Sequence, residues 1–211
     1  AAGSHQKAAA AHAAGKFTAE ILPVTIPQKK GDPVLFSADE SVRADTTPET
    51  LGKLKPAFKK DGTVTAGNAS GINDGAAAIV MMEASAAQKK GLKPIARLVA
   101  YGHAAVDPDY MGLGPIPAVK NVFAKAGLKP SDIDVIESNE AFAVQAMAVS
   151  RDLEFDPAKV NPNGGAVALG HPIGGTGAIL TVKALSELQR IQKRYALVTM
   201  CIGGGQGIAA I

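Results

Sequence analysis

The chain has 211 residues, enough for one large domain or two small ones. Its net charge is only +3 and 46% of its residues are hydrophobic, so we expect a folded core and no nucleic-acid partner. The lone cysteine, Cys201, cannot form an internal disulfide, no apolar run is long enough to span a membrane, and no secretory signal opens the chain. These features predict a soluble, cytoplasmic protein without membrane segments.

Residues 1–65 show little regular structure. We expect a short helix over Ser4–Lys16, an extended stretch at Ile21–Pro27, and a second short helix that starts at Thr47-Pro48. A long, charged, proline-punctuated segment of this kind is typical of a binding loop, a lid or an insertion. Because predicted elements run almost to both ends of the sequence, we expect it to be a piece of a longer protein.

The next stretch begins with a loop of small residues, Ala66–Gly75. It leads into Ala76–Met82, whose apolar run fits either a helix or a strand. A helix follows over Ser85–Lys90, and Gly91 predicts its end because glycine readily takes the left-handed conformation of a helix C-cap.

From residue 96 strands and helices alternate regularly. The predicted strands are Ala96–His103, Ile133–Ser138, Tyr195–Cys201 and a last one ending at Ile211; the predicted helices are Pro115–Ala126, Glu140–Leu153 and Ala178–Arg194. This alternation indicates a layered α/β domain. The glycine-rich turn Gly203–Gly207 predicts that the last two strands form a hairpin.

The stretch Asn161–Gly177 holds six glycines and one ionisable side chain, His171. Glycine lets the backbone approach a ligand closely, and a histidine can transfer a proton near neutral pH. The alternative is a tight packing loop around a core histidine. The reactive side chains at the other strand ends help to decide between a proton-transfer loop and a packing loop.

Three loops expected at strand ends each carry one reactive side chain: Asn139, His171 and Cys201. Ligands of open α/β sheets bind beyond the carboxyl ends of the strands, so these side chains are candidates for one site. Asn139 suits holding a water or a developing oxyanion, and Cys201 suits acid/base chemistry. Taken singly, Asn139 also fits a helix N-cap and Cys201 a buried small hydrophobe.

The motifs around these residues resemble those of the thiolases, the acetyl-CoA C-acyltransferases. The matching stretches are Asn139-Glu-Ala-Phe142, Asn161-Pro-Asn-Gly-Gly165, Gly170-His-Pro-Ile-Gly174, Cys201-Ile-Gly-Gly-Gly205 and Gly207-Ile-Ala-Ala210, with Ser4-His-Gln-Lys7, Val42-Arg-Ala-Asp45 and Thr65-Ala-Gly-Asn-Ala-Ser70 upstream. Several motifs in the right order cover nearly the whole chain. The residues that make up these motifs are most similar to those of bacterial short-chain β-ketothiolases.

The resemblance implies a thiolase-like α/β/α fold in three parts. Residues 1–70 would belong to the loop domain that covers coenzyme A, and residues 71–93 would close the N-terminal thiolase half. Residues 94–211 would form the C-terminal thiolase domain. A homodimer or homotetramer is implied for the complete enzyme.

The resemblance also implies site residues and substrates. Cys201 would be the acid/base that takes a proton from acetyl-CoA, while His171 and a water held by Asn139 would polarise the thioester oxygen. The residues implied in binding coenzyme A and the acyl group are Arg43 at the adenine end, Ser70 at the pantetheine, Met111 and Phe142 along the narrow pocket, and Ala66 and Gly203. Acyl-CoA thioesters would be substrates, with no permanent cofactor and no metal.

One departure from the family pattern matters most. Thiolases use two cysteines, and the context of Cys201 is that of the acid/base cysteine and not of the acyl-accepting nucleophile. We therefore expect this chain to be inactive without an N-terminal thiolase half, on the same or a separate chain. An inactive coenzyme A-binding fragment or interaction module is the alternative. A ketoacyl-synthase relative fits less well, because those enzymes carry their essential cysteine in the N-terminal half.

Overall fold

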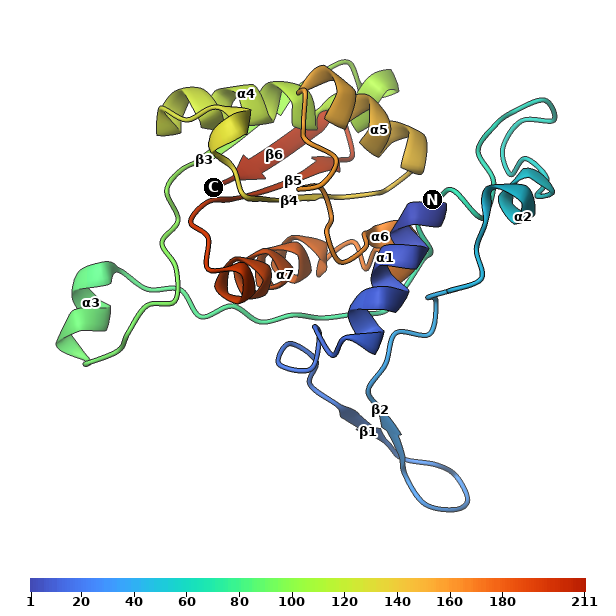
Figure 1. The fold of residues 1–211 in the computed structure, drawn as a ribbon, viewed down its shortest axis with the longest axis horizontal. Helices are drawn as coiled ribbons and strands as arrows, with labels where there is room; N and C mark the ends of the chain where they lie inside the picture. Colours follow the sequence, from blue (N-terminus) through green and yellow to red (C-terminus); the bar gives the residue numbers. More distant parts are fainter.

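A four-stranded mixed sheet is the centre of the structure, a computed structural model that describes all of residues 1–211 (Figure 1). The strands are β3 (Tyr101–Ala105), β4 (Val135–Ser138), β5 (Ala196–Ile202) and β6 (Gln206–Ala210), in the spatial order β3-β6-β5-β4. β4 runs parallel to β5, and the other pairs are antiparallel. The predicted hairpin of the last two strands is confirmed.

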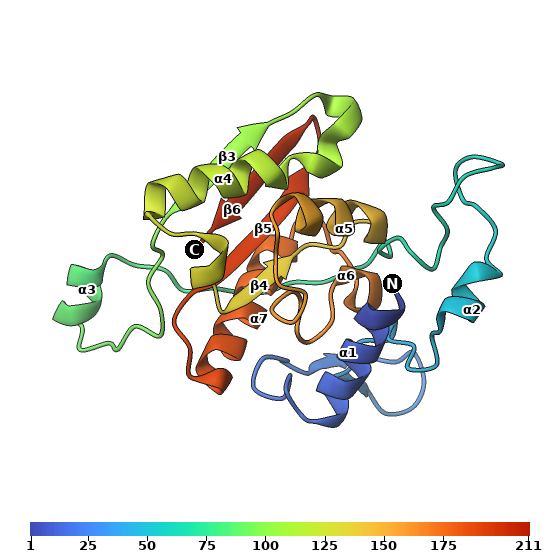
Figure 2. The same cartoon turned by 45° about the horizontal axis from the view of Figure 1, so that its top comes forward.

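Helices cover both faces of this sheet. On one face lie α4 (Pro115–Ala126) and α5 (Ala143–Asp152); on the other lie α7 (Thr176–Ile191), the short α6 (Ala166–Leu169) and α1 (Ala2–Ala13), as Figures 1 and 2 show. The predicted thiolase-like α/β/α layering is therefore confirmed. None of the helices combines the length and apolar character that a membrane span needs.

The main core lies between the sheet and α4. Val119 and Val122 of α4 pack with Ile136 of β4 and Leu197 of β5, and each is at most 1% exposed. Gly102 of β3 permits this close approach, because a Cβ there would lie 2.9 Å from the backbone nitrogen of Val122. Small residues at the helix–sheet contact thus bring two layers together.

Several predicted boundaries agree closely with the structure. The helix predicted over Pro115–Ala126 has those bounds, and Gly127 ends it at φ +65°. Thr47 caps the short α2 (Pro48–Gly52) by accepting a 3.2 Å hydrogen bond from the Thr50 nitrogen. The helix α3 (Ala84–Lys89) ends just before Gly91, as predicted.

Other boundaries were wrong, for identifiable reasons. The helix predicted from Glu140 begins only at Ala143, because the preceding backbone is extended and pairs with the 68–70 segment: the Ser70 nitrogen donates to the Ala141 carbonyl (3.0 Å) and the Ala143 nitrogen to the Asn68 carbonyl (2.8 Å). Tertiary pairing here overrides the helical pattern.

Three further boundaries moved along the chain. The strand predicted over Ala96–His103 is regular only from Tyr101, although the Val99 nitrogen still donates to the Ile211 carbonyl at 2.7 Å. The last helix starts at Thr176 and ends at Ile191, because Gln192 takes a left-handed φ of 52°. The helix α6, four residues long, was not predicted.

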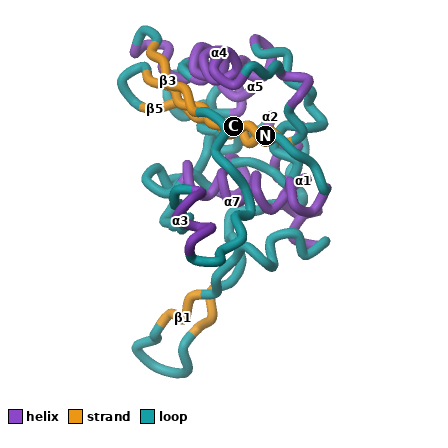
Figure 3. Tube along the Cα trace, turned by 90° about the vertical axis from the view of Figure 1, so that its left-hand side faces the viewer, coloured by secondary structure: helices purple, strands orange, loops and turns teal.

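The first third of the chain is extended around the body. The hairpin of β1 (Val24–Ile26) and β2 (Val34–Phe36) projects away from the sheet, as Figure 3 shows. Two 3-10 turns, η1 (Pro108–Leu113) and η2 (Pro130–Asp132), link later elements. The expectation of a helix or strand at residues 76–82 was wrong: this segment is irregular, with Val80 87% exposed, because no strand of this chain lies beside it.

Gly207→Ala should destabilise the fold. A Cβ at position 207 would overlap the backbone carbonyl of Gly114, where β6 meets the start of α4. Overpacking of this kind costs about 1–3 kcal/mol of unfolding free energy, which chemical denaturation measures. Gly52→Ala is the control, because its Cβ would meet nothing within 4 Å. Equal stabilities of the two variants would contradict the close contact.

Candidate functional site

Asn139 and His171 lie side by side, as the sequence predicted. The Asn139 Nδ2 atom is 3.2 Å from His171 Nε2. Asn139 follows β4 directly and its backbone nitrogen donates to the Thr199 carbonyl at 2.9 Å, so it sits against β5 two residues before Cys201. The Cys201 thiol itself makes no hydrogen bond to either side chain; Cys201 lies near the end of β5, the strand that pairs with β4.

The tautomer of His171 follows from its neighbours. The Thr176 hydroxyl donates its only proton to the Pro172 carbonyl (2.9 Å), so it accepts a hydrogen bond from His171 Nδ1 (2.7 Å). The Nδ1 atom therefore carries the proton, and the bare Nε2 accepts from the Asn139 amide. Burial lowers the pKa of His171, which keeps the ring neutral near pH 7.

Cys201 is buried, with 6% of its surface exposed. Burial raises the pKa of the Cys201 thiol, and a backbone hydrogen bond at the same residue only partly opposes this. Desolvation of the thiolate is the larger effect, so Cys201 is a thiol near pH 7.

The loop that carries His171 is fixed by the segment 66–75. The His171 nitrogen donates to Asn73 Oδ1 at 3.2 Å, and Gly170 turns the chain at φ +96°. A cavity of about 360 Å³ lies between Asn73–Ala77 and Pro172–Gly175. Two loops far apart in the sequence thus flank an open surface pocket that begins at Pro172, the residue after the histidine.

The loop that carries Asn139 is fixed from its other side. Asn161 accepts from the Ser138 nitrogen (2.9 Å) and donates to the Ser138 carbonyl (2.8 Å). Glu140 accepts from Ser4 of α1 (2.6 Å) and from Asn161 (3.2 Å). The Asn139 Oδ1 atom is buried and has no hydrogen-bond partner, which leaves one acceptor open beside His171.

The residues expected to bind coenzyme A fall into separate places. Ser70 and Phe142 are close neighbours: the Ser70 hydroxyl donates to the Ala141 carbonyl at 3.0 Å, and Ala69 bridges to Phe142. Met111 lies half-buried in η1. Arg43 is exposed beside α1, where its backbone nitrogen donates to His5 Nδ1 at 3.2 Å. The remaining two, Ala66 and Gly203, are exposed on their loops.

Sequence reasoning missed four residues that build the site. These are Phe58, Asn73, Glu140 and Thr176. The Phe58 ring packs edge-on against Phe142 with centroids 6.3 Å apart, although its own side chain is 75% exposed. Thr176 had a usable signal, because a hydroxyl five residues after a loop histidine at a helix start can orient its ring. No local sequence signal marks Phe58 or Asn73, since their contacts form only when segments distant in the sequence come together in the fold.

Comparison with known families matches both parts of the chain to one family. Residues 1–85 match the family description "Thiolase, N-terminal domain", and residues 92–211 match "Thiolase, C-terminal domain". A β-ketothiolase, BktB of Cupriavidus necator, is 64% identical over 209 residues, and an acetyl-CoA acetyltransferase of Escherichia coli is 56% identical over 208 residues. Each alignment covers 99% of this chain but only 53% and 52% of the relatives.

Solved structures agree with these relatives. An acetyl-CoA acetyltransferase of Bacillus anthracis superposes with a TM-score of 0.95 at 49% identity, covering 98% of this chain and 52% of that one. A human mitochondrial 3-ketoacyl-CoA thiolase in complex with CoA superposes with a TM-score of 0.89 at 44% identity, covering 99% and 52%. The chain thus spans about half the length of the proteins it matches.

Thr176→Val should disturb the tautomer of His171. Valine has the same shape as threonine but offers no acceptor to Nδ1, so the neutral ring should become a mixture of both tautomers. Thr176→Ser keeps the hydroxyl and should keep the Nδ1-protonated form. Two-bond ¹H–¹⁵N correlation spectra of the imidazole distinguish these states. An unchanged spectrum for the valine variant would remove Thr176 as the residue that orients the ring.

Cys201 should react with iodoacetamide only at high pH. An ordinary thiol has a pKa of about 8.5, and burial holds the pKa of Cys201 above its usual value. The folded chain therefore binds this proton more tightly than the unfolded chain, and that contribution to stability is lost as pH rises through the raised pKa. Mass spectrometry of the Cys201 peptide gives the rate at each pH. Identical profiles for folded and denatured protein would contradict the shift.

Proposed function

This chain belongs to the thiolase family, and we propose that it supplies the acid/base part of a reversible Claisen condensation. Two acetyl-CoA molecules, or acetyl-CoA and a short acyl-CoA, would give a 3-ketoacyl-CoA and free coenzyme A. The observation that carries the proposal is the direct contact between Asn139 and His171, 3.2 Å apart, beside the strand end of Cys201. All three side chains are of the types that proton transfer and oxyanion stabilisation need.

His171 and Asn139 would stabilise the thioester oxygen as it gains negative charge. The unpartnered Oδ1 of Asn139 supports a bound water, because that atom can accept a hydrogen bond from water while the water's second proton faces the substrate. For Nε2 to carry a proton toward the oxyanion, the Thr176 hydroxyl would rotate to donate to Nδ1, and the Asn139 amide, which donates to Nε2 in this structure, would turn away from it. The site thus has donors for the charge that develops.

Cys201 would exchange a proton with the α-carbon of acetyl-CoA. In the condensation, its thiolate removes a methyl proton, and the resulting carbanion attacks the acyl carbon on a second, nucleophilic cysteine, whose thiolate then leaves. The raised pKa of Cys201 supports its role as the acid that returns the proton in the reverse reaction. For the forward reaction Cys201 must first lose its proton to another group, because the nucleophilic cysteine is acylated at this step and its sulfur then accepts no proton.

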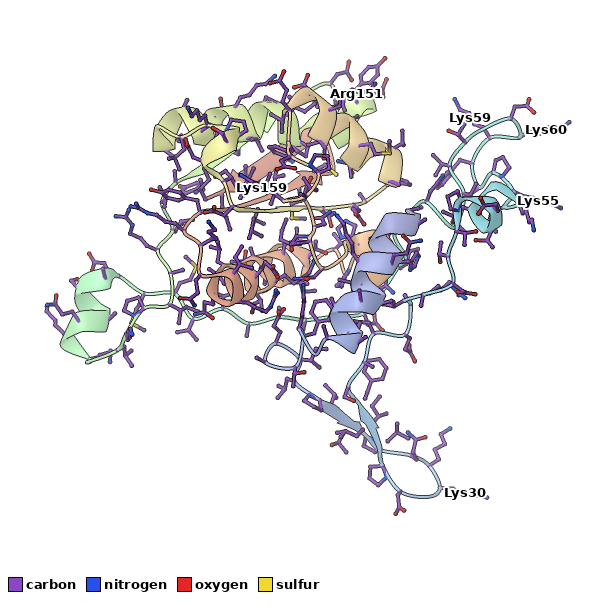
Figure 4. All side chains as sticks on the ribbon, in the orientation of Figure 1. Lys30, Lys55, Lys59, Lys60, Arg151 and Lys159 are labelled. Atoms are coloured by element: carbon purple, nitrogen blue, oxygen red, sulfur yellow. The ribbon has the colours of Figure 1, made fainter.

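Coenzyme A would bind across the extended first third of the chain. We assign the pantetheine to Ser70 and Ala66, the adenine end to Arg43, and the acyl pocket to Met111, Phe142 and Gly203. Figure 4 labels Lys55, Lys59 and Lys60 on the loop after α2, whose Phe58 packs on Phe142. These lysines place positive charge near the proposed binding path of an anionic ligand.

The domain division and assembly are part of the same proposal. Residues 1–70 would cover coenzyme A, residues 71–93 would close the N-terminal half, and residues 94–211 would form the C-terminal domain. The exposed apolar side chains of residues 79–82 support a missing neighbour at this place. Activity would then require the N-terminal half with its nucleophilic cysteine, in a homodimer or homotetramer, and the chain alone would be inactive.

Cys201→Ser in the full-length protein should nearly abolish condensation. A serine hydroxyl is far too weak an acid to exchange the substrate proton, whereas acyl transfer to the other cysteine does not use this residue. Radiolabelled acetyl-CoA should therefore trap an acyl-enzyme without product.

Cys201→Ala should also trap an acyl-enzyme without product. The wild type should prefer short acyl chains in a chain-length series. Condensation by the serine variant at a near-normal rate would reduce Cys201 to a packing residue. A wild type that binds coenzyme A but is neither acylated nor able to condense acetyl-CoA would favour a coenzyme A-binding module.

A further inference from the structure

A buried ion pair lies beneath β4 and takes no part in the proposed chemistry. The Lys183 Nζ atom of α7 is 2.7 Å from Glu137 Oε2 of β4. The Glu137 side chain is fully buried and that of Lys183 is 6% exposed. By contrast, the ion pair between Lys120 and Asp152 is 2.9 Å long but lies on the surface, with 60% and 45% of the side chains exposed.

Lys183 also bonds to the glycine loop. Its Nζ atom donates to the Gly164 carbonyl at 2.7 Å. Gly164 has φ +83°, and a Cβ there would lie 2.7 Å from the Ser4 carbonyl of α1, so only glycine fits at this crossing. One ammonium group therefore connects β4, α7 and the loop at residues 161–165.

The same loop is tied to α7 at a second point. Asn163 donates to Glu187, one turn after Lys183, and accepts from Lys16 at 3.0 Å. Glu187 also pairs with Arg190. The Asn163 side chain of the loop thus faces the charged side of α7.

This loop holds the position of Asn139. Asn161 bonds to both backbone groups of Ser138, and the Gly165 nitrogen donates to Ser4 (2.9 Å), which in turn donates to Glu140. Asn139 lies between Ser138 and Glu140. A shift of the loop would therefore move the asparagine relative to His171.

His171 depends on the same helix from its other end. Thr176, which orients the ring, begins α7, and Lys183 lies about two turns further along. α7 is thus the rigid element that relates the histidine to the asparagine. A one-ångström error in such an arrangement is enough to lower a rate by about 10²-fold.

We propose that Lys183 is a positioning residue for the Asn139–His171 pair, acting through its bonds to Glu137 and the Gly164 carbonyl. Stability alone is a weak reason for the pair, because buried ion pairs are often no more stabilising than apolar side chains of similar size. What an apolar pair cannot supply is the donor to Gly164. The catalytic consequence rests on the proposed function, whereas the geometric one does not.

The test uses variants of the full-length protein. Lys183→Met alone should lower Tm, because it leaves the Glu137 carboxylate buried without a partner. Lys183→Met with Glu137→Leu removes both charges and should recover Tm. It should still lower kcat by about 10- to 100-fold with KM for acetyl-CoA unchanged. Lys120→Met, which removes the exposed ion pair, is the matched control and should change neither.

A readout independent of activity separates this proposal from the proposed function. The imidazole ¹⁵N resonance of His171 Nε2, assigned with a His171→Asn variant, should shift in the double variant because its hydrogen bond from Asn139 is lost. That shift is expected even if the wild type does not condense acetyl-CoA, an outcome that would sink the proposed function alone.

Recovery of Tm, kcat and the His171 resonance together in the double variant would overturn the positioning role. Lys183 and Glu137 would then form a purely structural ion pair. If Lys183→Met with Glu137→Leu does not fold, Lys183→Gln with Glu137→Gln takes its place. A glutamine at position 183 is too short to bond both partners as Lys183 does. The same loss of kcat and the same His171 shift are expected, and recovery of Tm, kcat and the His171 resonance together would overturn the proposal.

Discussion

The position of the whole site depends on one side-chain amide. Asn161 bonds to the nitrogen and the carbonyl of Ser138, so it pairs both backbone groups of the last residue of β4. It does so from a left-handed backbone conformation, φ 43°, which asparagine tolerates better than most residues. Without this amide the chain after β4 would leave two buried backbone groups unpaired, at a cost of about 1–3 kcal/mol each. Asn139 and Glu140 take their places from this fixed point.

The C-terminal layered domain was the most predictable part of the chain. Helix α4 has a clear apolar periodicity and a glycine at its end, and both are local signals. The start of α5 was not predictable, because the backbone of Ala141–Ala143 pairs with a segment about seventy residues earlier. The prediction for residues 76–82 was wrong in the opposite way, because a regular element was expected where the structure is irregular. Their composition fits a regular element, but no strand of this chain pairs with them.

The candidate site was likewise predictable only in part from local sequence signals. Asn139, His171 and Cys201 could be named as candidates from their residue types and motifs, and the structure brings Asn139 and His171 into contact. Their electrostatics could not be predicted in this way. The sequence names Cys201 and His171 as candidate acid/base groups but not the direction of their pKa shifts: burial raises the pKa of Cys201 and lowers that of His171. Both shifts favour the uncharged forms, so the site of this chain is a neutral one. Desolvation is a property of the packed structure, and no motif reports it.

The irregular segment at residues 76–82 has a consequence for handling the protein. It reads Ala-Ala-Ala-Ile-Val-Met-Met, with no charge and no proline, and its larger side chains are exposed. Uncharged apolar stretches of this length are templates for intermolecular strand pairing. A preparation in which nothing covers this stretch should therefore associate into cross-β aggregates as concentration rises. Its solubility would then be set by these seven residues more than by the net charge of the surface.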